Sequence, residues 1–332
     1  MENMVKSHFW RDRRVFVTGA SGLIGGWLTQ SLVAKGADVV ILLRDWVPNA
    51  NLILSKTLEK TTVVRGDLSD PKPLERVLAE YEIQSVFHLA AQTIVPIANK
   101  NPLSTFESNI AGTWNLLEAC RHVQGIESIV IASSDKAYGD VEKLPYSETM
   151  PLNAIYPYDV SKACADMLGQ CYAKTFDLPV GITRCGNFFS GGDLNWNRLV
   201  PGTIRAVMRQ ESPIIRSSGQ LIRDYIYIED AVDAYMQLSA ALTSDKTLRG
   251  EAFNFSNESQ KTVLDLTQMI LDSLGSKVEP VIQGNNQGEI INQCLSATKA
   301  KTLLNWKPKI GIEEGIKRTI CWYENYFASQ KV

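Results

Sequence analysis

The sequence predicts an α/β protein built on a doubly wound parallel sheet, with a smaller α/β lobe appended to it. Short apolar runs alternate with amphipathic segments through most of the chain, which is typical of strands alternating with helices. A glycine-rich turn follows the first apolar run, and polar residues follow several later ones. Because ligands of such sheets bind at the carboxyl ends of the strands, these observations favour a Rossmann-type sheet with a ligand site along that edge.

Composition is that of an ordinary globular protein, and 332 residues are enough for two domains. The net charge of -2 leaves no basic excess for binding nucleic acid or a membrane surface. No apolar run approaches the ~18 residues of a membrane span, and the N-terminal residues lack the apolar stretch of a secretory signal. We therefore expect a soluble cytoplasmic protein that binds neither nucleic acid nor membrane.

The chain offers few candidates for metal binding. None of its three His has a partner that suggests a metal site or a catalytic triad, and His88 lies in an apolar run where a core role is expected. The cysteines are scattered, with no Cys-x-x-Cys pair, so buried reduced thiols are expected and a bound metal is not. They are Cys120, Cys164, Cys171, Cys185, Cys294 and Cys321.

The first strand is expected over residues 15–18, and it leads directly into the glycine turn. The turn has the spacing GxxGxxG and opens a helical pattern that ends at Lys35 and Gly36. Backbone N–H groups at a helix N-terminus attract anions, and glycines let a pyrophosphate approach them. Its place after the first strand favours a dinucleotide site over a simple tight turn. The residues predicted to form the site are Gly19, Ser21, Gly22, Leu23, Ile24 and Gly25.

Three further strands are expected over residues 38–43, 63–65 and 85–89, and each ends beside candidate cofactor contacts. At the first of these ends an acid binds the adenosine ribose diol of NAD, whereas an Arg accepts the 2′-phosphate of NADP. Both residue types are present, so NADP stays open beside NAD; we expect Asp45 on the diol and Arg44 pointing elsewhere. The predicted contacts are Arg44, Asp45, Asp67, Leu68, Leu89, Ala90 and Ala91.

The next apolar run, residues 129–132, ends in two serines followed by Asp135 and Lys136. After a loop the chain reaches Tyr158 and, four residues later, Lys162. On a helix this spacing places both side chains on one face, where the ammonium can lower the pKa of the phenol. A free Tyr titrates near ~10, so a base at neutral pH needs a shift of about 3 units. A nicotinamide cation nearby would contribute to that shift.

Beyond residue 184 the pattern loosens into glycine-rich turns that hold Arg198, Arg216 and Arg223. Arginines among such turns fit a phosphate-binding lobe somewhat better than a solvated face. We expect residues 1–184 plus about 225–256 to form the dinucleotide-binding domain, and about 185–224 plus 257–332 to form the second domain. Helices are expected over residues 71–81, 103–121, 158–175, 201–209, 228–242, 263–274 and 312–326, and further strands over 180–184 and 252–255.

Six motifs together resemble the extended short-chain dehydrogenase/reductase superfamily over nearly the whole chain. They are TGASGLIG (18–25), GDL (66–68), HLAAQ (88–92), SNIAGT (108–113), YPYDVSK (156–162) and RDYIYIED (223–230). Within it the chain is similar to nucleotide-sugar 4,6-dehydratases of the CDP-glucose type, through SSDKAYGD (133–140) and TRCGNFFSGGDLNWNRLVP (183–201). The resemblance implies a two-lobed lyase that keeps its NAD bound and uses it twice in each turnover.

The resemblance also implies the chemistry. Tyr158 would take the C4 hydroxyl proton while hydride passes to the cofactor; a base then removes the C5 proton, an acid protonates the departing C6 hydroxyl, and hydride returns to C6. A charged Lys136 would be the acid and leave Asp135 as base, whereas a neutral Lys136 could be the base and a protonated Asp135 the acid. The related enzymes favour the second assignment. The implied catalytic residues are Ser134, Asp135, Lys136, Tyr158 and Lys162.

The implied substrate is CDP-glucose, bound by the second domain. Asn187, Arg198 and Arg223 would meet its phosphates, and residues 213–218 would lie against the base. The resemblance further implies a homodimer formed through the helices at 103–121 and 158–175. The substrate contacts expected in all are Gln92, Ser134, Asn187, Arg198, Leu199, Arg216 and Arg223.

Two other functions stay open. A UDP-sugar 4-epimerase has the same class of fold and a simpler cycle, but epimerases usually carry small or neutral residues where Asp135 and Lys136 stand. A non-catalytic protein that senses a dinucleotide would have no reason to keep Ser134, Tyr158 and Lys162 together.

Overall fold

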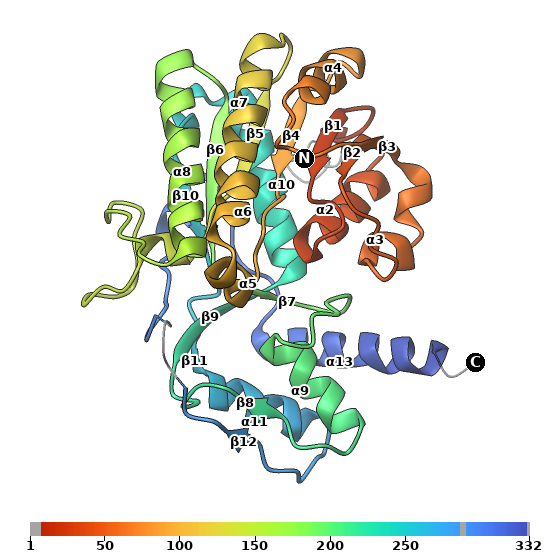
Figure 1. Cartoon of the computed structure of the whole chain (residues 1–332), viewed down its shortest axis with the longest axis vertical. Coiled ribbons are helices and arrows are strands. Elements are labelled where there is room, and N and C mark those ends of the chain that lie inside the picture. Colours follow the sequence, from red (N-terminus) through yellow and green to blue (C-terminus); the bar gives the residue numbers. More distant parts are fainter. Residues whose placement is uncertain (1–7, 286–289, 331–332) are drawn as a thin grey trace.

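The computed structural model describes residues 8–285 and 290–330, and its centre is a seven-stranded parallel sheet (Figure 1). The strand order is β10-β6-β5-β4-β1-β2-β3, in which the winding reverses between β1 and β4. This is the order of a doubly wound Rossmann-type sheet, so the predicted fold class is confirmed. The strands are β1 Arg14–Thr18, β2 Asp38–Leu43, β3 Thr62–Arg65, β4 Ser85–His88, β5 Ser128–Ala132, β6 Val180–Cys185 and β10 Ala252–Phe255.

Helices cover both faces of this sheet because its strands are apolar on both sides. In β1, Val15 and Val17 join the core beneath α2 and α10, whereas Phe16 joins the core beneath α4, α7 and α8. The first core also takes in Trp306, far along the chain. Burial on both faces explains the near-continuous apolar runs that predict the strands. The helices are α2 Leu23–Ala34, α4 Lys72–Glu80, α7 Gly112–His122, α8 Pro157–Phe176 and α10 Ile228–Ser244.

A smaller lobe lies below the main sheet in Figure 1 and has a core of its own. It holds a three-stranded sheet, β11-β9-β7, and a two-stranded sheet, β12-β8. Ile204, Ile270 and Ile316 bring α9, α11 and α13 together in its core. The elements are β7 Asn187–Phe189, β8 Ile214–Ile215, β9 Ile222–Tyr227, β11 Gln260–Thr262, β12 Val281–Ile282, α9 Leu199–Met208, α11 Val263–Ser273 and α13 Ile312–Ser329.

The helix predicted over residues 103–121 is interrupted. It consists of α6 Pro102–Phe106, a π-helical turn Glu107–Ala111, and α7. Such turns often occur at functional sites because the extra residue redirects side chains, and no hydrophobic period marks them in a sequence. The other predicted helices lie within one turn of their expected bounds. The sequence did not indicate the short elements α3 Asn51–Leu54, α5 Val95–Lys100, α12 Thr298–Leu303 and the 3₁₀ turns Thr57–Lys60, Asp135–Tyr138 and Lys246–Leu248.

Composition led to expectations about the thiols and about membrane-spanning helices. Burial of all the thiols is wrong for Cys171 and Cys321, which are exposed because they lie on the outward sides of α8 and α13. Within residues 8–285 and 290–330, every helix is too short or too polar to cross a membrane. The predicted domain ranges also include residues 1–7, 286–289 and 331–332, which lie outside the described residues.

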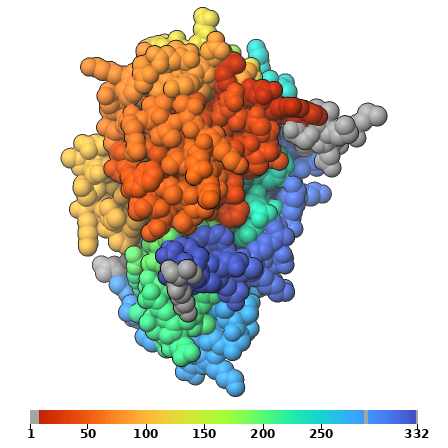
Figure 2. Space-filling view, turned by 90° about the vertical axis from the view of Figure 1, so that its right-hand side faces the viewer, coloured from red at the N-terminus to blue at the C-terminus, as the bar shows by residue number. Residues whose placement is uncertain are grey.

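The C-terminal helix α13 lies across the junction between the two lobes. Figure 2 shows it in dark blue, between the orange N-terminal part of the chain and the green segment of the smaller lobe. The ring of Trp322 packs so closely on Gly191 that a Cβ there would lie 2.1 Å from it. Trp27 of α2 donates its indole N–H to the carbonyl of the same glycine at 3.0 Å. The loop after β7 is therefore held between α2 and α13.

The glycine turn after β1 touches the loop after β4. Gly19 has a φ of 77°, and a Cβ there would lie 2.5 Å from the backbone nitrogen of Ala90. A Cβ on Gly25 would lie 2.1 Å from the carbonyl oxygen of Gly19. Gly22 precedes α2 and donates its N–H to the same carbonyl at 3.0 Å. The close approach of backbones, where the winding reverses, explains why the turn carries these glycines.

We expect Gly25→Ala to lower the free energy of unfolding by about 1–3 kcal/mol, because the new methyl group overlaps the carbonyl of Gly19. Gly26→Ala on the same helix is the matched control: its Cβ would meet nothing nearer than 3.4 Å, so stability should change by at most about 1 kcal/mol. Urea unfolding followed by circular dichroism measures both. Equal stability of the two variants would contradict the packing argument.

Candidate active site

β5 ends in a 3₁₀ turn, η3 (Asp135–Tyr138), and two serines fix this turn in place. Ser134 caps it and donates its hydroxyl to Oδ1 of Asp135 at 3.0 Å. Ser133 donates its hydroxyl to the backbone carbonyl of Lys162 at 3.3 Å. The pair therefore joins η3 to α8, which carries the predicted Tyr–Lys pair.

Asp135 is the most enclosed of the predicted catalytic residues, with 3% of its surface exposed. Both carboxyl oxygens have partners: Oδ1 accepts from Ser134, and Oδ2 accepts from the amide of Gln293 at 3.1 Å. Burial raises the pKa of Asp135, and the neighbouring Lys136, Ser134 and Arg223 oppose that rise. Lys136 is half-buried. The turn thus presents a buried carboxyl group beside a more accessible amine.

Tyr158 and Lys162 occupy the first two turns of α8, as the spacing predicts. The ammonium of Lys162 donates to the carbonyl oxygen of Ala132 at 2.8 Å, and burial lowers its pKa to about 8. Burial and the charge of Asp135 raise the pKa of Tyr158, whereas hydrogen bonding with Ser134 lowers it. Ser134 therefore lies between the tyrosine and the carboxyl group.

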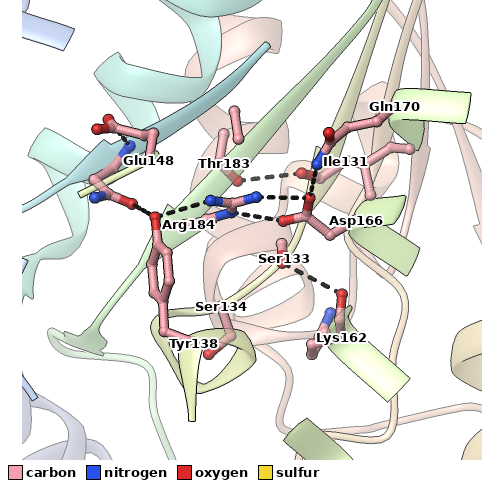
Figure 3. A network of polar contacts seen from close by, with 12 residues as sticks. Ile131, Ser133, Ser134, Tyr138, Glu148, Lys162, Asp166, Gln170, Thr183 and Arg184 are labelled. Atoms are coloured by element: carbon pink, nitrogen blue, oxygen red, sulfur yellow. Dashed lines mark hydrogen bonds and ion pairs between the residues drawn. The ribbon is translucent and has the colours of Figure 1, made fainter. Parts of the chain in front are cut away.

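A buried polar network supports η3 from behind (Figure 3). Arg184 of β6 donates to both carboxylate oxygens of Asp166 on α8, at 2.8 and 3.0 Å. It also donates to the hydroxyl of Tyr138 at 2.9 Å, and that hydroxyl donates to Asn254 of β10 at 2.8 Å. Gln170 donates to Asp166 at 2.6 Å. The network joins η3, α8, β6 and β10 around one guanidinium.

Asn109, in the π-helical turn, ties the loop after β4 to α8. Its side chain accepts from the backbone N–H of Gln92 at 2.7 Å and donates to the carbonyl of the same residue at 3.1 Å. It also donates to the hydroxyl of Ser161 at 2.9 Å. The motif SNIAGT contains Asn109, but sequence reasoning gave this residue no role. Gln92, a predicted substrate contact, is thereby held beside the start of α8.

At the expected cofactor end, Arg44 lies against carboxylates. Its Nε is 2.7 Å from Oδ2 of Asp45 and 3.9 Å from Oδ2 of Asp67. Arg44 therefore lies between two acids at adjacent strand ends, which attract its charge. That Asp45 meets the ribose diol while Arg44 points elsewhere stays a prediction. All three side chains are well exposed.

His88 is a satisfied core residue, as expected. Its two ring nitrogens lie 2.9 Å from the hydroxyls of Thr18 and Thr113. Burial, followed by the charge of Lys162, lowers its pKa to about 3, so the ring is neutral. It packs beneath the site and does not reach into it.

Two of the predicted phosphate arginines meet at one loop. Arg198, just before α9, pairs with the buried carboxylate of Asp193 at 3.0 Å. Arg216, just after β8, donates to the side chain of Asn197 at 2.6 Å. Both are partly exposed, so residues 193–198 gather two guanidinium groups on the smaller lobe. Asn187, exposed at the start of β7, and Leu199, in the first turn of α9, flank the loop in sequence.

Arg223 lies apart from that loop. It is 7% exposed, and its Nη1 donates to the carbonyl oxygens of Ile222 and Ile291 at 3.0 and 3.2 Å. Its charge acts on Asp135. The third arginine therefore faces η3 from the smaller lobe.

Asp224, the next residue, is a buried carboxyl group that sequence reasoning missed. Its Oδ2 accepts from the hydroxyl of Ser256 at 2.5 Å and from the N–H of Leu295 at 3.0 Å. Its Oδ1 has no hydrogen-bond partner among the described residues. Burial raises the pKa of Asp224 to about 7, and Asp135 adds to the rise. The motif RDYIYIED contains Asp224, but sequence reasoning gave this residue no role, because its partners come from distant segments.

The doubly wound sheet, the glycine turn where the winding reverses and the Tyr–Lys pair opening α8 define the extended short-chain dehydrogenase/reductase class. Within that class, the chain belongs to the family described as GDP-mannose 4,6 dehydratase, whose model matches residues 16–319. Relatives of the chain are named for several different nucleotide sugars, so membership of this family leaves the substrate open.

Related sequences divide between two reactions. The chain is 29% identical to the CDP-glucose 4,6-dehydratase of Salmonella typhimurium, over 98% of this chain and 95% of the relative. It is 30% identical to a putative UDP-glucose 4-epimerase of Methanocaldococcus jannaschii, over 94% and 98% of the two chains.

Solved structures divide in the same way. The dTDP-glucose 4,6-dehydratase of Streptomyces venezuelae, solved with NAD bound, has a TM-score of 0.84 and 25% identity over 95% of this chain and 98% of that one. The UDP-glucose 4-epimerase of Thermotoga maritima, solved with UDP-glucose, has a TM-score of 0.85 and 26% identity over 95% and 99%. The shared fold is thus common to both reactions, and only the site residues can separate them.

The raised pKa of Asp224 makes stability depend on pH. In the unfolded chain its carboxyl ionises near 3.8, whereas the folded protein keeps the proton up to about 7. The contribution of the Asp224 carboxyl group to the free energy of unfolding is therefore complete below pH 4, and it is lost as the pH rises towards 7. Between pH 5 and 7.5 the wild type should lose about 2–3 kcal/mol of unfolding free energy through this carboxyl group, and Asp224→Asn should not show that loss.

Urea unfolding at the two pH values measures this difference. Asp38→Asn, at an exposed position at the start of β2, is the control and should lose as much stability as the wild type. The same loss in Asp224→Asn as in the wild type would show that Asp224 is already ionised at pH 5.

Proposed function

We propose that this protein is an NAD-dependent nucleotide-sugar 4,6-dehydratase that converts CDP-glucose to CDP-4-keto-6-deoxyglucose. One observation carries the proposal: Asp135 and the adjacent Lys136 follow the carboxyl end of β5, and the charge of Asp135 acts on Tyr158. Oxidation at C4 needs one proton carrier, and elimination of water across C5 and C6 needs two more. Cytidine as the nucleoside of the substrate is supported by the Salmonella relative and by the sequence of residues 133–140.

The residues present fit a dinucleotide. The glycine turn presents backbone without side chains at the N-terminus of α2, and Gly19 lies against Ala90 after β4. Asp45 and Asp67 offer carboxylates for ribose hydroxyls, and their pairing with Arg44 leaves that guanidinium less suited to a 2′-phosphate. When bound, the oxidised nicotinamide takes hydride from C4 and later returns it to C6. The structural neighbours solved with NAD support NAD over NADP.

In the first half of the reaction Tyr158 takes the proton of the C4 hydroxyl. Its burial opposes ionisation, so the phenolate needs nearby positive charge and donors. Lys162, one turn along α8, supplies the charge together with the nicotinamide. Hydrogen bonding with Ser134, whose hydroxyl is shared with Asp135, also lowers the pKa of Tyr158. We propose that Ser134 contacts both Tyr158 and the sugar.

In the second half a proton leaves C5, and the C6 hydroxyl departs as water with a proton from an acid. We assign the acid to Asp135, because its burial favours the protonated carboxyl group. Lys136, in its neutral form, is then the base that takes the C5 proton. As hydride returns to C6, Lys136 gives its proton back to C5, and the proton that Tyr158 took from the C4 hydroxyl replaces the one that Asp135 gave to the departing water. The sugar thereby loses one water, and all three protein residues return to their starting states.

The smaller lobe is proposed to hold the diphosphate. Arg198 and Arg216 converge on residues 193–198, and Asn187 lies nearby in sequence. Guanidinium groups suit phosphate oxygens because they donate in pairs. On this proposal residues 1–184 and about 225–256 bind the dinucleotide, and about 185–224 and 257–332 bind the nucleotide sugar.

A homodimer is proposed to form over α6, α7 and α8, where α7 and α8 lie side by side (Figure 1). Leu103, Trp114 and Met167 are 66%, 46% and 61% exposed on these helices. Exposed apolar side chains on each of these three helices favour contact with a second copy over contact with water.

The second candidate is a nucleotide-sugar 4-epimerase, which the relatives and neighbours of that activity favour. Such an enzyme needs Tyr158 and a keto sugar that can turn in the site. It makes no use of two further proton carriers, and a buried carboxyl group is costly to keep without a purpose.

Mass spectrometry of products from CDP-, UDP-, dTDP- and GDP-linked hexoses tests the proposal. Loss of one water, fastest in kcat/KM with CDP-glucose, is the expected result, and NAD should be the dinucleotide extracted from the purified protein. An unchanged mass with altered sugar stereochemistry would establish the epimerase instead. Because bases are told apart by one or two hydrogen bonds of about 1–3 kcal/mol each, slower reaction with UDP-glucose is expected.

Substitutions at η3 should separate oxidation from elimination. We expect Asp135→Asn and Lys136→Ala to reduce bound NAD on addition of substrate but to release at least 100-fold less dehydrated product, because Tyr158 is intact. Tyr158→Phe is the matched control and should block the reduction of NAD itself. Absorbance of the reduced nicotinamide and product mass, followed together, measure both steps. Normal dehydration by either η3 variant would show that the substituted residue has no catalytic role.

A further inference from the structure

Gln293 reaches the candidate site from a distant segment. It lies between β12 and α12, where the chain passes beside β9 and its backbone N–H donates to the carbonyl of Ile222 at 3.0 Å. The neighbouring residue Asn292 forms a bridge with the same strand. Gln293 is 1% exposed, so its side chain is enclosed and its direction is fixed by packing.

The amide of Gln293 contacts the carboxyl group of Asp135. Its Nε2 donates to Oδ2 at 3.1 Å, while Ser134 donates to Oδ1. Its Oε1 has no hydrogen-bond partner among the described residues, although it is buried. A buried acceptor without a donor is costly, so the orphan oxygen calls for a partner in some state of the protein.

A carboxyl group that exchanges a proton needs different partners in its two states. When ionised it only accepts hydrogen bonds, and when protonated it also donates one. A primary amide has both a donor and an acceptor, and a turn about its last bond exchanges them. The orphan Oε1 of Gln293 is the acceptor that a protonated Asp135 requires, and Nε2 is the donor that an ionised Asp135 requires.

We propose that Gln293 is a positioning residue for Asp135, whose amide holds the carboxyl group in both protonation states of the cycle. The inference rests on the proposed function in so far as Asp135 exchanges a proton during elimination. Gln293 does not transfer a proton itself. It keeps the carboxyl group directed towards the sugar and sets how readily that group takes up and releases its proton.

Other groups also act on this carboxyl. Within the described residues, charges and titratable groups face it from η3 itself, from the loop after η3, from α8, from β6 and from β9. They are Lys136, Tyr146, Tyr158, Cys185, Arg223 and Asp224. Gln293 differs from all of them because it does not titrate and carries its donor and its acceptor on two separate atoms, with the donor already on the carboxyl.

The chain contains a matched control. On α10, Gln237 donates from Nε2 to Oδ2 of Asp233 at 2.8 Å, and its Oε1 likewise has no partner among the described residues. This pair makes the same amide–carboxylate contact as Gln293 and Asp135, with Lys309 as a further partner of Asp233, but lies outside the candidate site. Gln→Met at each position removes the amide and keeps similar volume.

The first measurement follows the reaction. Gln293→Met should reduce bound NAD at the wild-type rate on addition of substrate and form dehydrated product at least tenfold more slowly. Gln293→Glu should move the limb of the kcat–pH profile that belongs to Asp135 to higher pH, because a second carboxylate disfavours ionisation of the first. Gln237→Met should match the wild type throughout. Wild-type elimination and an unmoved limb in both Gln293 variants would overturn the inference.

The second measurement needs no substrate. With carbonyl-¹³C aspartate incorporated and the Asp135 signal identified by its loss in Asp135→Asn, an NMR titration gives the pKa of that carboxyl directly. Loss of the amide donor in Gln293→Met should raise it by about one unit, and Gln237→Met should leave it unchanged. An unchanged titration in Gln293→Met would overturn the inference even if the wild type dehydrates sugars. A clear shift in a protein that dehydrates no nucleotide sugar would uphold the contact and refute the proposed function.

Discussion

The buried ion pair between Arg184 and Asp166 is the interaction on which the site depends. Taking both charges out of water is costly, and the cost is offset only when every donor and acceptor is used. Here Asp166 accepts two bonds from Arg184 and one from Gln170, and Arg184 also holds Tyr138. Because these residues belong to β6, α8 and η3, one pair sets the spacing between the helix of Tyr158 and the turn of Asp135. Loss of either charge would leave the other buried and uncompensated, at about 3–5 kcal/mol.

A second group of buried charges joins the lobes. Arg223 lies between carbonyl groups of the smaller lobe and acts on Asp135, and Asp224 beside it disfavours ionisation of the same carboxyl. On the other side, the pair of Asp193 and Arg198 sits in the loop that α2 and α13 hold. The charges of the smaller lobe thus act on the proton chemistry of the main sheet, Arg223 on Asp135 and Arg198 on Tyr158. A change of charge in either lobe should therefore alter the electrostatic environment of η3.

Much of this arrangement could be predicted because it is local. The apolar runs, the glycine turn and the spacing of Tyr158 and Lys162 are each contained in a few consecutive residues, and the structure has the strands and helices they indicate. Asn109 and Gln293 could not be predicted in the same way. The first depends on a π-helical turn, which leaves no hydrophobic period, and the second meets Asp135 across 158 positions of sequence. Pairing of Arg44 with Asp45 was also unforeseen, since a sequence shows adjacent charges but not the direction of their side chains.

The place of β10 and Trp306 in the main core has a consequence for synthesis. A nascent chain that has just completed β6 lacks the strand that pairs with it, and the first core still lacks its largest buried side chain. At about 5–20 residues per second, the ribosome needs roughly ten seconds more to deliver them. During that interval one edge of the parallel sheet has unpaired backbone groups and open apolar surface. Chaperone demand during translation should therefore be greatest while the smaller lobe is being made.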